Sequence, residues 1–438
     1  MADETVGATF DEALVGELGE TAVALDGTDP TAPLDDLAPL RDVLADVRVV
    51  GMGESTHGTR ECFRFKHRLF RFLVAELDYQ LFAIEANFSE TLALNEYVVD
   101  GDGDPRDGLA NIYFWTWATE EVLALVEWMR EYNESRPRSE RVRFHGIDAQ
   151  YLPGAATALS EYLAAVDPEY LATVETDCDA LAGDPLSTYD LDDDAVAEAQ
   201  TELDRAIDLA TDLDARLEAN EDAYVEASSR SAFELARRHC RVLQQATAFK
   251  QAQLDDDGQA AYEVRDAAMA ENVAWLLDYE DEHRVAVWAH DDHVRRGEVE
   301  APDWTAETMG EDLDSEFGAD YYALSLQFAR GEFQVYDPDS DAPTRAVSIA
   351  DPPAESLPNL FDTLGGDAAV LDLDAVDDGS PLEDWLAEPR RVHSIGATFD
   401  ADDYPGDYVP AYDLRETFDG VAFVGDSTRA RPVERGGE

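Results

Sequence analysis

The feature that constrains this chain most is a short apolar segment followed by a glycine-rich turn and a long amphipathic stretch. Residues 47–50 include three valines, a pattern that is too short and too β-branched for a helix and is typical of a buried strand. Apolar residues in 59–77 recur at helical spacing. The turn between the two segments contains Glu54 and His57. A strand that leads into a helix indicates an α/β sheet, whose ligands bind beside such turns.

Glycines precede Glu54 and follow His57 in this turn. Glycine allows a close approach of backbone and positive φ, so we expect open space beside these two side chains. A carboxylate and an imidazole held there suggest chemistry. The competing interpretation is a loop histidine that only caps the following helix. Ser55, in the same turn, is expected to cap that helix.

The composition indicates a folded protein with an extremely acidic surface. The 438 residues include 98 Asp and Glu against 32 Lys and Arg, a formal net charge of -66. The hydrophobic fraction of 45% is sufficient for a core, so the acidity does not indicate disorder. Carboxylates spread along the chain indicate adaptation to concentrated salt, where cations screen their repulsion. Nucleic acids and anionic membranes are therefore not expected partners.

The sequence contains no targeting or membrane signal that we recognise. Its first residues lack the basic and apolar regions of a signal peptide, and no apolar segment reaches membrane-spanning length. The three cysteines, Cys62, Cys178 and Cys240, are too scattered for a disulfide framework or a metal cluster. We therefore expect a soluble cytoplasmic protein, and the sequence makes no prediction of its oligomeric state.

Strand and helix patterns alternate along the chain, which predicts an α/β fold with a mostly parallel sheet flanked by helices on both faces. Residues 151–280 have helical periodicity and almost no strand signal, so they are expected to form an inserted helical subdomain or lid. The expected organisation is N-terminal helices in 1–46, a catalytic core in 47–150 and 281–438, and the insertion between them. Further strands are expected at 321–328, 368–373, 393–399 and 421–424.

Four predicted strands, far apart in sequence, end in ionisable residues. The first leads to Glu54 and His57, and the others end at Glu85, at Asp148, and at His290 with His293. Parallel strands bring their carboxyl ends to one crevice, so we expect these groups to lie together.

Imidazoles and carboxylates in one crevice are compatible with two kinds of hydrolysis. A histidine can deprotonate water directly, or a metal held by His and Glu can activate it. The chain lacks the G-x-S-x-G nucleophile elbow, which argues against a serine nucleophile. The spacing of His290 and His293 lacks the further residues of common zinc motifs, so no metal and no cofactor is predicted.

Several short motifs resemble the erythromycin esterase family. The main ones are Gly53-Glu54-Ser55-Thr56-His57-Gly58, Ala83-Ile84-Glu85, Gly146-Ile147-Asp148, Arg265-Asp266 and Trp288-Ala289-His290-Asp291-Asp292-His293. The resemblance covers most of the chain beyond residue 40. One departure is Asp291, where the family often has Asn.

The resemblance implies hydrolysis of an ester or lactone, with macrolide antibiotics as the family's substrates and antibiotic resistance as its context. His57 would be the general base that activates water, surrounded by the essential groups Glu54, Glu85, His290 and His293. Arg60 and Arg265 are candidates for holding these carboxylates, with Asp148 and Ser55 as supporting residues. Some family members resemble succinoglycan-biosynthesis proteins, so the resemblance extends to fold and site more securely than to substrate.

Two other functions are compatible with the same residues. A metal-dependent hydrolase would use the His and Glu cluster as ligands, and a non-catalytic protein would bind a carbohydrate or other small molecule in the same pocket. All three interpretations predict a small-molecule partner.

Overall fold

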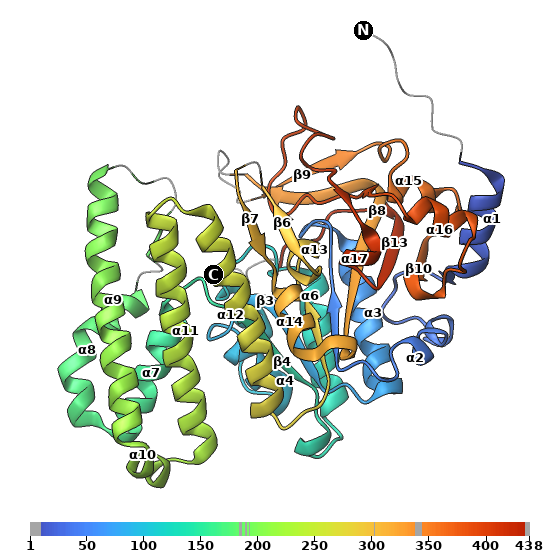
Figure 1. The fold of residues 1–438 in the computed structure, drawn as a ribbon. Coiled ribbons are helices and arrows are strands. Elements are labelled where there is room, and N and C mark those ends of the chain that lie inside the picture. Colours follow the sequence, from blue (N-terminus) through green and yellow to red (C-terminus); the bar gives the residue numbers. More distant parts are fainter. Residues whose placement is uncertain are drawn as a thin grey trace.

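The structure is a computed structural model that describes residues 10–183, 186–188, 191, 193–301, 303–337 and 344–433. Its centre is a nine-stranded sheet with helices on both sides (Figure 1). The strands are β1 (Val23–Leu25), β2 (Val49–Met52), β3 (Leu81–Asn87), β4 (Arg143–Asp148), β5 (Val285–Trp288), β8 (Tyr321–Tyr336), β9 (Thr344–Ile349), β10 (Ala368–Asp372) and β13 (Gly420–Ser427).

The sheet is mostly parallel. Its order is β1-β10-β13-β8-β2-β5-β3-β4, and the six strands from β13 to β4 are parallel neighbours. Strands β10 and β1 extend one edge in the antiparallel sense, and β9 pairs antiparallel with the second half of β8. The predicted fold class is therefore confirmed. Strands β2, β5 and β3 lie side by side in the middle, so their carboxyl ends share one edge of the sheet.

Alternating residues of the central strands pack into two separate cores. Val50 and Trp288 belong to the core beneath α3 and α6, whereas Val49 and Val287 belong to the core beneath α12 and α14. Successive side chains of a strand point to opposite faces, so a strand buried on both sides is apolar throughout. The helices packed around the sheet are α1 (Glu12–Thr21), α2 (Leu40–Val43), α3 (Arg60–Leu77), α4 (Leu92–Asp100), α5 (Pro105–Ala110), α6 (Glu120–Asn133), α14 (Met309–Phe317), α15 (Leu357–Asp362), α16 (Pro381–Leu386) and α17 (Leu414–Thr417).

The chain between β4 and β5 is helical, with no strand among its described residues. Figure 1 shows most of these helices as a bundle beside the sheet, with α12 lying between the bundle and the sheet. Helix α12 also packs against β3, β4 and β5. The helices are α7 (Pro153–Val166), α8 (Pro168–Gly183), α9 (Asp193–Ala219), α10 (Glu221–Ala227), α11 (Arg230–Leu254) and α12 (Gly258–Tyr279). That this helical insertion acts as a lid stays a prediction.

Three expectations about individual elements are wrong. The N-terminal part contains an edge strand, β1, in addition to helices, and β8 extends eight residues beyond its predicted end at Phe328. Residues 393–399 do not form a strand. Their backbone N–H groups are bonded elsewhere, because Ile395 donates to the carbonyl oxygen of Ser55 and Ser394 to that of Tyr408. The segment instead lies across the turn that contains His57.

Many apolar residues of the chain are buried in the two cores on either side of the sheet. In the described part of the chain, no helix combines the length and hydropathy needed to cross a membrane. Cys62, Cys178 and Cys240 are buried, and none of them forms a disulfide.

We predict that stability depends strongly on salt, because carboxylates outnumber cationic groups by 98 to 32. The screening length falls from about 10 Å at 0.1 M salt to about 3 Å at 1 M. Relief of 1 kcal/mol of repulsion raises the melting temperature of a medium-sized domain by roughly 2–4 °C. Thermal melts should therefore rise by several degrees or more between dilute buffer and molar KCl. Sucrose at matched osmolality is the control, since it is excluded from the protein surface but does not screen charge. Equal melting temperatures in dilute buffer and molar KCl would contradict this prediction.

Candidate active site

The turn after β2 is tightly enclosed by neighbouring backbone. A Cβ atom added to Gly53 would lie 2.0 Å from Oδ1 of Asp291 and 2.9 Å from the carbonyl oxygen of Leu324. One added to Gly58 would lie 2.0 Å from the carbonyl oxygen of Gln334. Neither glycine has positive φ, so close approach and not unusual backbone geometry explains these residues. The turn is therefore fixed by its contacts with β8 and with Asp291.

Glu54 and His57 form a hydrogen-bonded pair within this turn. Oε1 of Glu54 lies 2.8 Å from Nδ1 of His57, and Oε2 accepts hydrogen bonds from Nζ of Lys66 at 2.8 Å and Nε1 of Trp288 at 2.9 Å. Glu54 and Lys66 are both fully buried. Burial raises the pKa of Glu54, but Lys66 and His57 outweigh it and lower that pKa overall. Glu54 is thus an ionised carboxylate that accepts hydrogen bonds.

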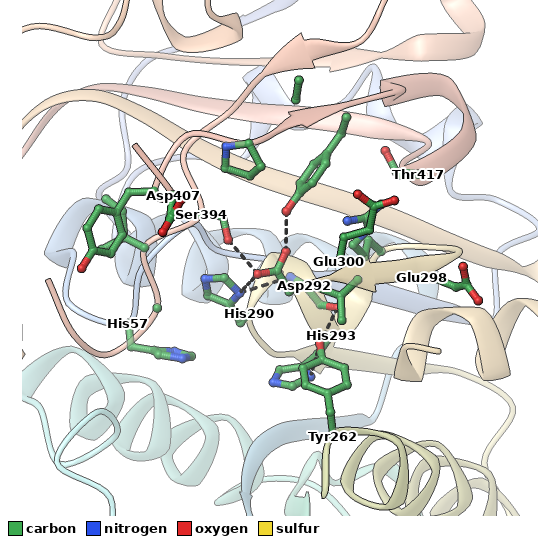
Figure 2. Close-up of a pocket in the computed structure, with 18 of the residues that line it drawn as sticks. His57, Tyr262, His290, Asp292, His293, Glu298, Glu300, Ser394, Asp407 and Thr417 are labelled. Atoms are coloured by element: carbon green, nitrogen blue, oxygen red, sulfur yellow. Dashed lines mark hydrogen bonds and ion pairs between the residues drawn. The ribbon is translucent and has the colours of Figure 1, made fainter. Parts of the chain in front are cut away.

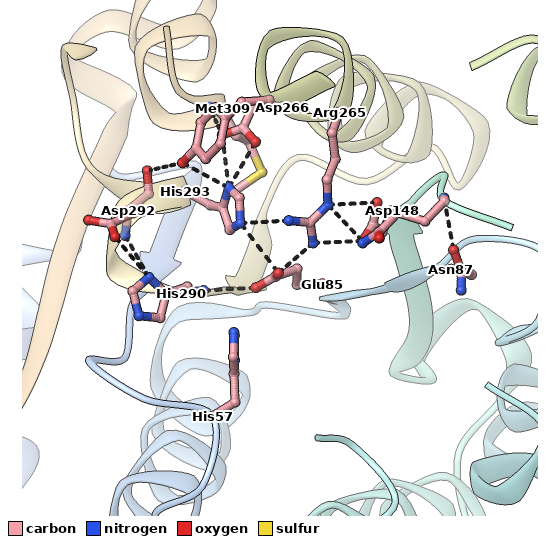
Figure 3. Close-up of polar contacts among 12 residues, drawn as sticks. His57, Glu85, Asn87, Asp148, Arg265, Asp266, His290, Asp292, His293 and Met309 are labelled. Atoms are coloured by element: carbon pink, nitrogen blue, oxygen red, sulfur yellow. Dashed lines mark hydrogen bonds and ion pairs between the residues drawn. The ribbon is translucent and has the colours of Figure 1, made fainter. Parts of the chain in front are cut away.

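This pairing determines where the free nitrogen of His57 lies. An ionised carboxylate only accepts hydrogen bonds, so Nδ1 of His57 carries a hydrogen and, in the neutral ring, Nε2 carries the lone pair. His57 lines a cavity, and its ring points toward Glu85 and His290 (Figure 3). The edge-to-face contact with Trp117, at 5.4 Å between ring centroids, holds the ring from the side. The arrangement is that of a general base supported by a carboxylate.

Glu85, near the end of β3, is the centre of a second network. Its Oε1 accepts a hydrogen bond from Arg265 at 2.6 Å, and its Oε2 accepts one from the backbone N–H of His290 at 2.9 Å. Arg265, on α12, also binds Asp148 at the end of β4 through two nitrogens. Burial alone would raise the pKa of Glu85, but His293 and Arg265 hold it well below its usual value. Arg265 therefore joins the carboxyl ends of β3 and β4 to the helical insertion.

His293 uses both ring nitrogens within the protein. Nδ1 lies 2.8 Å from Asp266, and Nε2 lies 2.9 Å from a guanidinium nitrogen of Arg265 and 3.4 Å from Glu85. The ring also stacks on Tyr262. Burial and Arg265 lower the pKa of His293, whereas Asp266 and Glu85 raise it, to about 10 overall. His293 is consequently held in place and has no ring nitrogen free to reach a substrate.

His290, at the start of helix α13 (Asp291–Val294), has one committed nitrogen and one free nitrogen. Nδ1 accepts from the backbone N–H of Asp292 at 3.2 Å and lies 3.4 Å from the Asp292 carboxylate. Nε2 is buried and has no hydrogen-bond partner among the described residues. The rings of His290 and His57 are 5.2 Å apart. An unpaired buried polar atom is rare, and here it borders a cavity.

The cavity has a volume of about 740 Å³ and opens between α12, the C-terminal segment and the hairpin of β6 (Glu298–Glu300) and β7 (Thr305–Glu307). Figure 2 shows His57, His290 and His293 on its wall. Its outer wall includes six carboxylate residues, Glu298, Glu300, Asp403, Asp407, Asp413 and Glu416. The volume is in the range of small-molecule sites.

The structure brings together most of the site residues expected from the sequence. The cavity is lined by His57, Glu85, Arg265, His290 and His293. Glu54 and Asp148 are buried behind it, where they bond His57 and Arg265. Arg60 lies elsewhere and forms an ion pair with Glu121 at 3.3 Å. Ser55 does not cap α3, because Thr59 is at the N-cap position and the Ser55 hydroxyl is buried without a hydrogen-bond partner.

Sequence reasoning missed four residues that complete these networks. Lys66 had a detectable signal, because it is one of only two lysines and falls on the apolar face of α3. Asp266 and Asp292 belong to motifs that resemble the family but were given no role there, and Tyr262 had no signal. These three act through contacts with His293 and His290 that depend on how α12 and α13 pack.

The described side chains do not form a metal-binding cluster. Among the described residues, no group of three or more His, Cys, Asp or Glu side chains is arranged to hold a metal ion. The guanidinium of Arg265 occupies the position beside Nε2 of His293 where a metal would bind.

The fold and site define a class: a mixed α/β protein with histidine–carboxylate pairs at the carboxyl edge of a mostly parallel sheet. The sequence profile of the family described as erythromycin esterase matches residues 74–427. The chain therefore belongs to the erythromycin esterase family, and this membership supports a hydrolase that acts on a small molecule.

Similar proteins agree with this assignment. An Escherichia coli protein described as erythromycin esterase type II is 26% identical over 71% of this chain and 76% of its own length. A putative hydrolase of Bacillus subtilis, YbfO, is 24% identical over 89% of this chain and 86% of its own length.

Solved structures show the same fold. A Bacillus cereus protein matches 97% of this chain and all of its own with a TM-score of 0.80 and 25% identity. A mutant of the erythromycin esterase EreC in its open conformation matches 93% of this chain and 98% of its own with a TM-score of 0.70 and 17% identity.

Proposed function

We propose that this protein hydrolyses a carboxylic ester or lactone with water activated by His57. The observation that carries the proposal is the pair of facing imidazoles, His57 and His290. Nδ1 of His57 is bonded to Glu54, Nδ1 of His290 faces the backbone N–H and the carboxylate of Asp292, and each ring has a free Nε2 beside the cavity. One free nitrogen can take a proton from water while the other donates a proton to an oxygen of the substrate.

In the proposed reaction, Nε2 of His57 takes a proton from water as its oxygen attacks the carbonyl carbon. Glu54 stabilises the resulting imidazolium through Nδ1–H, as the carboxylate does in hydrolytic triads. The tetrahedral intermediate then collapses as its C–O bond breaks and the leaving alkoxide takes a proton. Glu85 and Arg265 hold the backbone N–H of His290 and the end of β4 in place during these steps.

A macrolide lactone is the first substrate to test, because an erythromycin esterase is among the relatives of this chain. The experiment is a hydrolysis screen in molar KCl with macrolides, simple lactones and aryl esters, read by mass spectrometry of the products. An ester or lactone that gains one water in the presence of protein would support the proposal. Ligands that bind in calorimetry but are recovered unchanged from the whole panel would favour the non-catalytic alternative.

We predict that activity does not depend on a tightly bound metal, because His57 can act on water directly and Arg265 occupies the vicinity of His293. Prolonged treatment with EDTA, followed by removal of the chelator, should leave turnover within about twofold of the untreated protein. Elemental analysis of the same samples is the control. Stoichiometric zinc whose removal abolishes turnover and whose return restores it would contradict this prediction and favour the metal-dependent mechanism.

A further inference from the structure

The contacts of His290 determine which of its nitrogens carries a hydrogen. In the neutral ring, Nδ1 accepts from the backbone N–H of Asp292, which places the hydrogen on Nε2. In the protonated ring, both nitrogens carry hydrogen and Nδ1 faces the Asp292 carboxylate at 3.4 Å. In either form, Nε2 presents an N–H to the cavity, where it has no partner among the described residues.

Asp292 is itself held from the C-terminal part of the chain. The Ser394 hydroxyl donates to Oδ2 at 2.7 Å and the Tyr412 hydroxyl to Oδ1 at 2.8 Å. Figure 2 shows Ser394 and His290 converging on Asp292. The antiparallel pair β11 (Arg390–Arg391) and β12 (Ala411–Tyr412) brings these two hydroxyl groups together.

The carboxylates behind the two histidines differ in their neighbours. Glu54 is paired with Lys66, so its negative charge is compensated before His57 is considered. Asp292 has no Arg or Lys within 4 Å in the described part of the chain, and its ionic contact is with His290. A carboxylate without another counter-charge favours the imidazolium of its partner, whereas a compensated one does so less. The two pairs are therefore suited to opposite roles, an acid at His290 and a base at His57.

We propose that Asp292, held by Ser394 and Tyr412, is a positioning residue that makes His290 the proton donor of the reaction. This inference rests on the proposed hydrolysis and names the group that gives a proton to the leaving alkoxide. His293 is unsuited to the role because both of its ring nitrogens face groups of the protein, Asp266 at Nδ1 and Glu85 with Arg265 at Nε2. Ser394 and Tyr412, from the C-terminal segment of the chain, thereby support the reaction through Asp292.

The proton balance closes over one cycle. Water gives one proton to Nε2 of His57 and its oxygen forms the new bond to the carbonyl carbon. The protonated ring of His290 gives the hydrogen on Nε2 to the leaving alkoxide as the C–O bond breaks, and it keeps the hydrogen on Nδ1 beside the Asp292 carboxylate. His57 then passes its proton to His290, and the acid product ionises and releases one proton to solvent. Both rings return to their starting states.

Several charged groups surround His290. Burial lowers its pKa, but Asp292 and Asp291 outweigh burial and raise that pKa above the usual value, with His293 opposing them. Charged and titratable groups that line the same cavity from other elements include His57 on the turn after β2, Glu85 on β3 and Arg265 on α12. Asp292 is the nearest carboxylate to the ring nitrogens, so its removal should lower the pKa of His290.

The kinetic test is the variant Asp292→Asn, which keeps the shape and removes the charge. We expect kcat to fall by about 10²-fold. A proton donor must be protonated, so activity is lost as pH rises through its pKa, and a lower pKa moves that loss to lower pH. The alkaline limb of the pH–kcat profile should therefore move down by about 1 unit or more. A merely structural role would scale the profile without moving it.

A milder pair of variants tests the proposal even if Asp292→Asn does not fold. Tyr412→Phe removes one hydrogen bond to Asp292 and should lower kcat by about fivefold. Tyr404→Phe is the matched control. Its hydroxyl belongs to the same segment but contacts His393 and not Asp292, so it should retain wild-type kcat and profile. Equal kcat in Tyr412→Phe and the control would overturn the proposal.

A second measurement needs no substrate. Long-range ¹H–¹⁵N correlation spectra of the eight histidines, with His290→Asn for assignment, report the tautomer and titration midpoint of each ring. We expect His290 to keep a hydrogen on Nε2 and its midpoint to fall in Asp292→Asn. An unchanged midpoint would overturn the proposal. If the spectra behave as expected but the wild type hydrolyses none of the substrates, the proposed hydrolase function is contradicted, whereas the pairing of Asp292 with His290 is supported.

Discussion

The variant His57→Asn should keep its fold and lose about 10²- to 10⁴-fold in turnover, the usual effect of removing a positioned general base. Asparagine retains an N–H that can be donated to Glu54 but has no basic nitrogen at the position of Nε2. The measurement is steady-state hydrolysis of the substrate that the screen identifies, with circular dichroism to verify the fold. Wild-type turnover in this variant would show that His57 is not the base.

Ser55→Ala is the matched control in the same turn. The Ser55 hydroxyl is buried and forms no hydrogen bond among the described residues, so its removal breaks no contact and should leave turnover near wild type. A covalent acyl-Ser55 species in mass spectra of the quenched reaction would contradict the water mechanism.

The variant Glu85→Gln should have reduced turnover, because a neutral amide cannot match the charge of Arg265.

The variant Lys66→Met should lose about 3–5 kcal/mol of unfolding free energy, the usual cost of removing one partner of a buried ion pair. Lys66 and Glu54 are 2.8 Å apart and fully buried, so the Glu54 carboxylate would remain in an apolar environment without its cation. Methionine matches the lysine stem, which limits the loss of packing. Urea unfolding in molar KCl measures the change without altering ionic strength.

The double variant Lys66→Met with Glu54→Gln identifies the cause. If the uncompensated charge is responsible, the double variant should be more stable than Lys66→Met, because the stranded carboxylate is gone. The exposed pair of Arg41 and Glu76 provides a surface control, and Arg41→Met should cost about 1 kcal/mol or less. A Lys66→Met cost as small as that of Arg41→Met would contradict the prediction.

Elements with strong local signals could be predicted from the sequence. Helix α6 has such a signal, because its apolar residues recur at helical spacing directly after the N-cap residue Thr119. The central strands are short runs of apolar residues, because a strand that is buried on both faces of the sheet has apolar side chains at successive positions. Residues 393–399 misled the prediction because their alternation reflects contacts with the turn after β2 and not a strand ladder.

The candidate site was predictable to the extent that it follows from the sheet. Acids and histidines at the ends of parallel strands converge wherever those strands are neighbours, and β2, β5 and β3 are. The partners from outside the sheet could not be predicted in this way. Arg60 and Arg265 are alike as sequence features, yet Arg60 pairs with Glu121 on α6 and Arg265 with Glu85 and Asp148.

The sequence by itself determined that this chain forms an α/β sheet with imidazoles and carboxylates at strand ends, because strand and helix periodicity and strand-end chemistry are local properties. Only the tertiary structure decided which carboxylate pairs with which histidine. That pairing depends on distances of a few ångströms between elements far apart in sequence, such as Ser394 and Tyr412 beside Asp292. Because the proton affinity of an imidazole follows from such neighbours, the packing assigns the roles proposed for His57 and His290.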